Sequence, residues 1–227
     1  MTNNTSSSYG AAQGIMAKTA LNELRASGHP LGRPLALCLM FEAAENQLVA
    51  ASVFNLAIAL DAALHIPTES LLAEIRIQWW ADALASKTNQ NVPLIARLQS
   101  QYQRHDNFFT QLQGIIGKWQ AACHHKTRDS SEGWVAVWRS IAFHLGHMTA
   151  LDQAALIGRE LHNATLGQKC YGFAGSLTPS RQDFPIHRQK FMPIQPLTLF
   201  KLWGWRGGVF IPPKNMGENF DKSLKMY

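Results

Sequence analysis

Asp61 is the residue that comes closest to offering catalytic chemistry in this chain. It is the only acidic residue in residues 46–68, the most apolar part of the sequence. A second carboxylate one helical turn away would let two acids bind one cation from the same helix face. Position 65 is instead His65, and Asp82 is followed at the same spacing by Ser86. The sequence therefore offers Asp61 no second aspartate at this spacing with which to hold a cation such as Mg²⁺.

Cysteine and histidine suggest a second kind of site. Cys123, His124 and His125 precede His144 and His147, which are three residues apart on a predicted helix. Zn²⁺ binds thiolate and imidazole well. This spacing matches no established zinc pattern, so surface or core roles are favoured, and we predict neither a metal nor another cofactor. Dinucleotide-binding, Walker-type, nucleophile-elbow and zinc-protease motifs are also absent from the sequence.

The elements that would position these residues are helices. Apolar residues recur at helical spacing, and no stretch shows sustained alternation with a period of two. The predicted fold is therefore all-α. We expect helices over residues 11–26, 35–40, 48–66, 70–84, 93–102, 107–123, 134–146, 150–161 and 196–205.

The stretch from Phe54 to Leu84 organises the rest of the chain. Pro67 ends one helix, and Thr68 or Ser70 can cap the next. In that second helix one apolar row has the spacing of a face that contacts a core, which makes this helix a predicted core element. The row consists of Leu71, Ile75 and Trp79, with Leu72, Trp80 and Leu84 alongside.

Residues 48–66 are long and apolar enough to raise the question of a membrane span. Asp61 lies within them, and an aspartate inside a bilayer is costly. A buried helix of a bundle is therefore the favoured interpretation.

Composition and charge indicate one domain that depends on partners. The chain has 227 residues, of which 16% are charged and 46% hydrophobic. So few charged and so many hydrophobic residues fit burial in a larger assembly, or a large interior cavity. The three cysteines are widely spaced, which indicates reduced thiols. The first acid is Glu23, so a weak mitochondrial import signal is conceivable.

The net charge of +6 lies entirely in the C-terminal quarter. Residues 169–227 hold nine Lys or Arg and three acids, whereas the preceding residues hold twelve of each. This surplus suits an acidic protein, anionic lipid or RNA, although a solvated tail is the simpler alternative. We expect a polar segment over 1–14, a helical domain over 15–206 and an extended basic tail over 207–227. The candidate partner-binding residues are Lys201, Trp203, Trp205, Arg206, Lys214, Lys222 and Lys225.

The stretch that contains Phe54, Asn55 and Glu69 and continues as EIRIQWWADAL over residues 74–84 resembles the squalene/phytoene synthase family. It is closest to the branch that includes a mitochondrial complex I assembly factor. Weaker similarities follow over residues 134–146 and 191–197. The resemblance implies an isoprenoid-synthase-like helical bundle, whose catalytic members condense prenyl diphosphates held by two aspartate-rich motifs.

Because the paired aspartates are missing, the resemblance implies a protein that has lost the family's catalysis. The residues expected at a vestigial cavity are Asp61, His65, Arg76, Trp79 and Trp80. The expected role is an accessory subunit or assembly factor of a respiratory complex, on the matrix side of the mitochondrial inner membrane. Its partners would be the other subunits of a large hetero-oligomer, with possible contact to anionic lipid.

Two alternatives remain open. A surviving prenyl-diphosphate enzyme or lipid-binding protein would have an open apolar cavity and would use Asp61. A recruited subunit of the mitochondrial ribosome would place Lys201, Arg206, Lys214 and Lys222 against RNA, and its binding would weaken steeply with salt.

Overall fold

The computed structural model describes residues 5–40, 42–86, 91–102, 107–146, 148 and 151–165. Over these ranges the chain forms helices, turns and bends and contains no strand, which confirms the all-α prediction. The predicted helix over 196–205 and the predicted tail over 207–227 lie outside the described residues.

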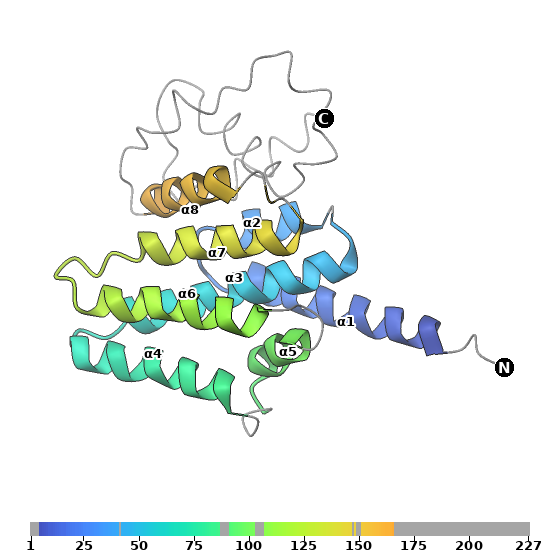
Figure 1. Ribbon diagram of the computed structural model, residues 1–227, viewed down its shortest axis with the longest axis horizontal. Coiled ribbons are helices and arrows are strands. Elements are labelled where there is room, and N and C mark those ends of the chain that lie inside the picture. Colours follow the sequence, from blue (N-terminus) through green and yellow to red (C-terminus); the bar gives the residue numbers. More distant parts are fainter. Residues whose placement is uncertain are drawn as a thin grey trace, which may run out of the picture.

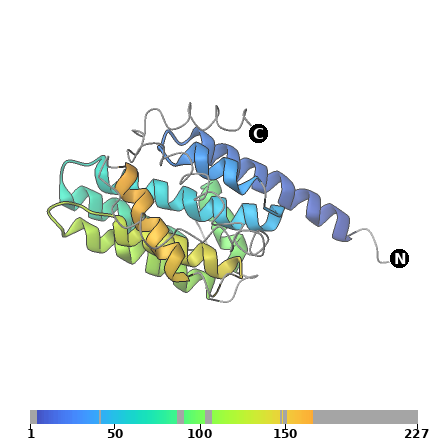
Figure 2. The same ribbon diagram turned by 90° about the horizontal axis from the view of Figure 1, so that it is seen from above.

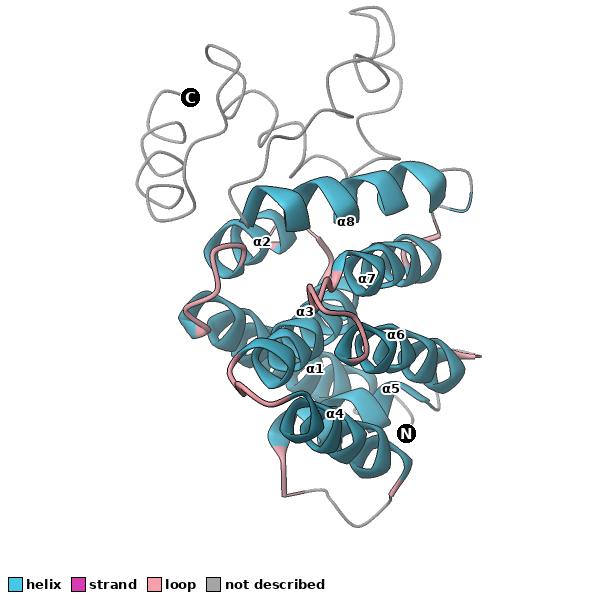
Figure 3. Ribbon diagram, turned by 90° about the vertical axis from the view of Figure 1, so that its left-hand side faces the viewer, coloured by secondary structure: helices cyan, strands magenta, loops and turns pink. Residues whose placement is uncertain are grey.

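The helices are stacked around a central one. Figure 1 shows α8, α7, α6 and α4 one below another, with α4 and α8 at opposite margins, and Figures 2 and 3 show the same bundle from above and from one end. Helix α3 packs against α1, α2, α4, α5, α6 and α7. The bounds are α1 Thr5–Ala26, α2 Gly32–Leu39, α3 Ala44–His65, α4 Ser70–Ala85, α5 Pro93–Tyr102, α6 Phe108–Cys123, α7 Ser131–His144 and α8 Leu151–Thr165.

Helix α3 is buried on nearly every side. Every residue of 48–57 is buried, and the four buried alanines of α3 let neighbouring helices approach closely. Its one buried amide is satisfied, because Asn55 Nδ2 donates to the carbonyl oxygen of Ala20 at 2.9 Å. By length and composition α3 could cross a membrane, but most of its apolar window lies inside the domain. The core-helix prediction therefore agrees with the structure.

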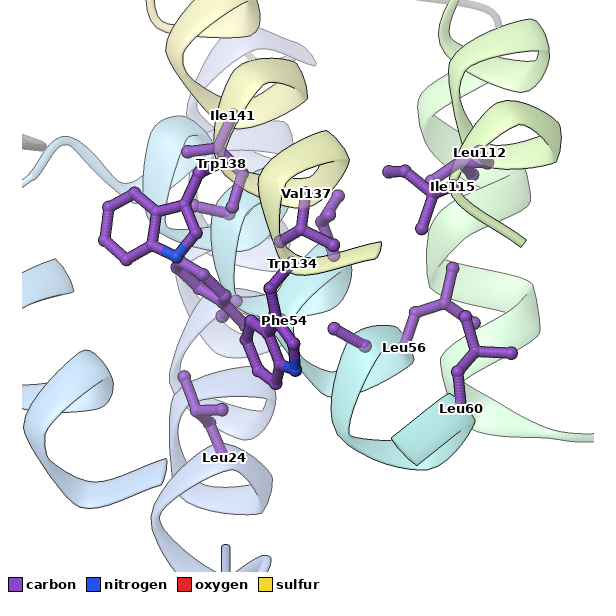
Figure 4. Close-up of a cluster of buried hydrophobic side chains, with 14 of the residues drawn as sticks. Leu24, Phe54, Leu56, Leu60, Leu112, Ile115, Trp134, Val137, Trp138 and Ile141 are labelled. Atoms are coloured by element: carbon purple, nitrogen blue, oxygen red, sulfur yellow. The ribbon is translucent and has the colours of Figure 1, made fainter. Parts of the chain in front are cut away.

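Large side chains complete the core around α3 (Figure 4). The rings of Phe54 and Trp138 meet edge to face with their centroids 5.2 Å apart, a favourable aromatic geometry. On the other side of α3, Leu56 and Leu60 lie towards Leu112 and Ile115 of α6. All six side chains are buried, so α3 is held from the α6 and α7 sides at once.

The start of α4 is not capped by Thr68 or Ser70, contrary to the prediction. Helix α3 ends at His65, as Pro67 predicts, but the N-cap of α4 is Glu69, whose side chain makes no capping hydrogen bond. Arg128, from the loop between α6 and α7, binds this junction instead. Its guanidinium donates to the carbonyl oxygens of Leu64, Pro67 and Thr68 and to Ser70 Oγ.

The predicted core face of α4 is wrong for its main row and for Leu72, and it is confirmed for Leu84. Leu71, Ile75 and Trp79 are exposed, and the residues that face the core are Ala73, Ile77 and Leu84. Trp80 is half-buried and packs against the core. Helix α4 is apolar on both sides, so apolar spacing by itself cannot indicate which side is inside.

Two further predictions concern the N-terminal segment and the thiols. Helix α1 begins at Thr5 rather than at residue 11, so it reaches into the segment expected to be polar and irregular. Cys38 and Cys123 are free and buried. Burial raises the pKa of both thiols, which makes them poor nucleophiles. Cys170 lies outside the described residues.

Candidate functional site

The strongest candidate site is a polar cluster around Asp61 in the core. Asp61 lies in the last two turns of α3 and is buried. Trp119 Nε1, from α6, donates to Oδ1 at 2.8 Å, and Trp134 Nε1, from α7, donates to Oδ2 at 2.8 Å. Each carboxylate oxygen therefore accepts one indole N–H. Charge-assisted bonds of this kind are the stronger class of hydrogen bond.

His29, from the turn between α1 and α2, covers the same carboxylate. Its Nδ1 accepts the backbone N–H of Leu31 at 3.2 Å, so in the neutral ring the proton is on Nε2. Nε2 lies 3.8 Å from Asp61 Oδ2, and the ring stacks on Trp134 with centroids 5.5 Å apart. The turn that ends α1 is thereby tied to α3 and α7.

His162, from α8, extends the cluster. Its Nε2 lies 3.2 Å from Oδ1 of Asp129, in the loop between α6 and α7. Burial lowers the pKa of His162, and the opposing attraction of Asp61 and Asp129 does not cancel this effect. For Asp61 itself burial raises the pKa, but the polar side chains around it outweigh burial, so the pKa is held below its usual value.

Two glycines allow Trp119 and Trp134 to reach Asp61. Gly133 lies directly against the ring of Trp119, because a Cβ atom at position 133 would come within 2.4 Å of it. Gly158 of α8 similarly lets α8 approach α7, where an added Cβ would meet the carbonyl oxygen of Trp134 at 2.5 Å. Only glycine fits these contacts without a shift of the neighbouring group. The two glycines therefore position the indole donors through backbone packing.

The chemistry open to this cluster is limited. A lowered pKa makes the Asp61 carboxylate a weak base at neutral pH. Within the described part of the chain, no group of three or more His, Cys, Asp or Glu is placed to hold a metal ion. The observed contacts are those of a buried charge that joins helices, as expected of a structural carboxylate that is fully hydrogen-bonded.

The structure does not bring the predicted cavity residues together. Asp61 is in the core, whereas His65, Arg76 and Trp79 are exposed, and Trp80 is half-buried. Arg76 and Trp79 belong to the outer side of α4. Besides Asp61, His65 belongs to the surroundings of the cluster, because its charge helps to lower the pKa of His162. The predicted partner-binding residues, all from Lys201 onward, lie outside the described residues.

The alternative zinc ligands are separated as well. Cys123 ends α6, whereas His144 ends α7 and contacts Phe108, at the start of α6, with ring centroids 4.8 Å apart. The length of α6, about 22 Å at 1.5 Å per residue, therefore lies between Cys123 and His144. Position 147 lies outside the described residues.

Sequence reasoning missed the partners of Asp61. It identified Asp61 but did not single out Trp119, Trp134 or His29 as its neighbours. One signal was available: a lone carboxylate in an apolar helix requires donors, and buried tryptophans carry a donor that requires an acceptor. The spacing along the chain, however, does not indicate which tryptophans meet Asp61.

In comparisons with known proteins, no family model, no curated protein and no solved structure matches this chain. The resemblance to squalene/phytoene synthases therefore stays a prediction.

Proposed function

We propose that this protein is a noncatalytic helical docking body, an accessory subunit or assembly factor of a respiratory complex on the matrix side of the mitochondrial inner membrane. The proposal that the protein is noncatalytic rests on the environment of the Asp61 carboxylate. Both of its oxygens accept an indole N–H at 2.8 Å. Asp61 is also buried, and in the described part of the chain no group of three or more His, Cys, Asp or Glu is placed to hold a catalytic cation with it.

The respiratory complex and the mitochondrial location are supported by sequence features. They are the resemblance over residues 54–84, the low content of charged residues and the concentration of positive charge in residues 169–227. A protein with this composition gains stability when it buries apolar surface against partners. The isoprenoid-synthase-like label for the bundle belongs to this proposal too.

Calorimetric titration of the full chain with farnesyl diphosphate tests the noncatalytic part. We expect no saturable binding that depends on Mg²⁺, with a matched titration in excess chelator as the control. Saturable Mg²⁺-dependent binding that Asp61→Asn abolishes, in a variant that still gives the parent circular dichroism spectrum, would overturn the proposal in favour of a prenyl-diphosphate protein.

A native gel tests the proposed association with a respiratory complex. Mitochondria that carry the tagged full chain are solubilised in mild detergent, and the tag is followed together with respiratory subunits by mass spectrometry. We expect the chain to migrate with a respiratory complex or with one of its assembly intermediates. Migration as a free monomer, or with ribosomal proteins and RNA, would contradict the proposal.

A further inference from the structure

The outer side of α4 carries a row of large apolar side chains in water. Leu71 is 64% exposed, Ile75 56%, Trp79 46% and the adjacent Leu72 46%. Leu71, Ile75 and Trp79 follow each other at i, i+4 and i+8, so they form one continuous row along the helix. We call these four residues the outer row of α4.

The inner side of the same helix is already packed. Ala73, Ile77 and Leu84 are buried, and α4 contacts α3, α5 and α6. Its C-terminal carbonyl groups are also engaged, since Gln99 Nε2 donates to those of Leu84 and Ser86. Helix α4 is apolar on its outer side as well as on its packed side, and burial of apolar surface is favourable. The outer row is therefore the side that a further partner would cover.

The outer row is presented by a helix that is held in place. Trp79 meets Trp80 edge to face with centroids 5.1 Å apart, and Trp80 packs on the core. Gln78 Oε1 accepts from Gln120 Nε2 of α6 at 2.8 Å, which connects the middle of α4 to the bundle. Such a surface loses little conformational freedom when a partner binds.

The charges beside the outer row favour one class of partner. Glu74 and Asp82 lie along one edge of α4, Glu69 precedes the helix, and Arg76 lies on the opposite edge. All four are exposed. The other guanidinium nearby, that of Arg128, is half-buried and donates to oxygens at the start of the helix, so carboxylates predominate on the exposed surface of α4. Glu74 also lies 3.9 Å from His124 Nε2, and Asp82 accepts from Gln78. An anionic lipid surface would be repelled by these carboxylates. Two copies paired with antiparallel α4 helices would place the carboxylate edge of one copy against that of the other.

We propose that the outer row of α4 binds an amphipathic helix of another protein, one whose apolar face carries Lys or Arg along its edge. The inference rests on the proposed role as a docking body and identifies the surface and the class of partner. Apolar anchors at helical spacing would pack on Leu71, Ile75 and Trp79, while the basic edge would face Glu74 and Asp82.

Site-specific photo-crosslinking in the native complex tests this proposal. A benzoylphenylalanine is placed at Leu72 of the full chain, and crosslinked peptides are identified by mass spectrometry. Ile15 provides the matched control site, because it is a similarly exposed apolar residue, on α1. We expect Leu72 to crosslink to a segment of another protein with apolar helical spacing and Lys or Arg on one edge, and Ile15 to crosslink far less to that segment.

A variant pair then tests the surface itself. Ile75→Glu should reduce the Leu72 crosslink about tenfold or more, equivalent to about 1.4 kcal/mol or more, while Ile15→Glu leaves the crosslink unchanged. Both positions are exposed, so the thermal unfolding temperature should stay at the parent value in both variants.

Several results would overturn the inference. They are a crosslink to residues 166–227 of the same chain, to a second copy or to lipid, and the absence of any crosslink. If the chain still migrates with a respiratory complex on the native gel, the docking role survives and only the assignment to α4 fails. If the chain migrates as a free monomer, both proposals fail together.

Discussion

Helices α3 and α4 follow each other in the chain and are both rich in apolar residues, yet the structure uses them in different ways. Helix α3 is enclosed by its neighbours, and its one buried acid, Asp61, has an indole donor on each oxygen. Helix α4 is packed on one side only, and its acids Glu74 and Asp82 are in water. The comparison teaches that apolar content by itself does not indicate how far a helix is buried, whereas the environment of its few acidic residues does.

Removing the carboxylate from α3 should have the largest effect. Asp61→Ala leaves the indole N–H groups of Trp119 and Trp134 without an acceptor in the core. At about 1–3 kcal/mol for each orphaned donor, the loss of unfolding free energy should be on the order of 4 kcal/mol. Urea unfolding measures it. Asp82→Ala on α4 is the control, since an exposed substitution should change stability by less than about 0.5 kcal/mol. Equal losses for the two variants would remove the distinction between the helices.

A matched pair of leucines sharpens the same comparison without any change of charge. Leu60→Ala in α3 creates a cavity beside α6 and should cost roughly 3 kcal/mol. Leu71→Ala in α4 removes a side chain that is already in water, so the isolated chain should lose less than about 0.5 kcal/mol. Urea unfolding of both variants checks this expectation. A loss of several kcal/mol for Leu71→Ala would mean that the outer row is covered within the chain itself.

A pair of glycines tests how the donors of Asp61 are positioned. Gly133→Ala places a methyl group against the ring of Trp119 and should destabilise the fold by about 1–3 kcal/mol through overpacking. Gly117→Ala in α6 has open space around the new methyl group, so helix propensity should make it stabilising by about 0.5–1 kcal/mol. Thermal unfolding distinguishes the two signs. A stabilising Gly133→Ala would show that Trp119 moves freely and is not held against Asp61.

The smallest expected effect is the pH dependence contributed by His162. Its pKa in the folded state is lowered by burial, although Asp129 and Asp61 oppose the shift and His65 adds to it. The unfolded chain therefore binds more protons just below the ordinary histidine pKa of about 6.5, so stability falls as pH falls through that value. His162→Gln should flatten the slope of unfolding free energy against pH between about pH 7 and pH 5. An unchanged slope would show that His162 titrates normally in the folded chain.

Much of the helical order could be predicted from sequence because it depends on local chemistry. The end of α3 before Pro67, the whole of α5 and the limits of α6 to within one residue follow from proline geometry and apolar spacing. The capping of α4 could not be predicted in this way. Thr68 and Ser70 are residues that cap helices well, but Arg128, distant in sequence, binds their carbonyl and hydroxyl oxygens instead.

The candidate site also has one feature that the sequence predicted and one that it did not. That Asp61 is alone, without a second aspartate at helical spacing, follows from the sequence. That its donors are Trp119 and Trp134 could not be read from it, because those residues are 58 and 73 positions away and the sequence contains seven tryptophans. Periodicity also failed to locate the inner side of α4, since both of its sides are apolar.

The sequence by itself determined that the chain is all-α in its described part, that α3 ends before Pro67, and that no paired aspartates are available. These properties depend on neighbouring residues, whose effects act over one or two helical turns. Only the tertiary structure decided which side of α4 contacts the core, which indoles donate to Asp61 and which loop holds the junction between α3 and α4. These are contacts between distant segments, and they depend on which helices pack together rather than on the local preferences of any one of them.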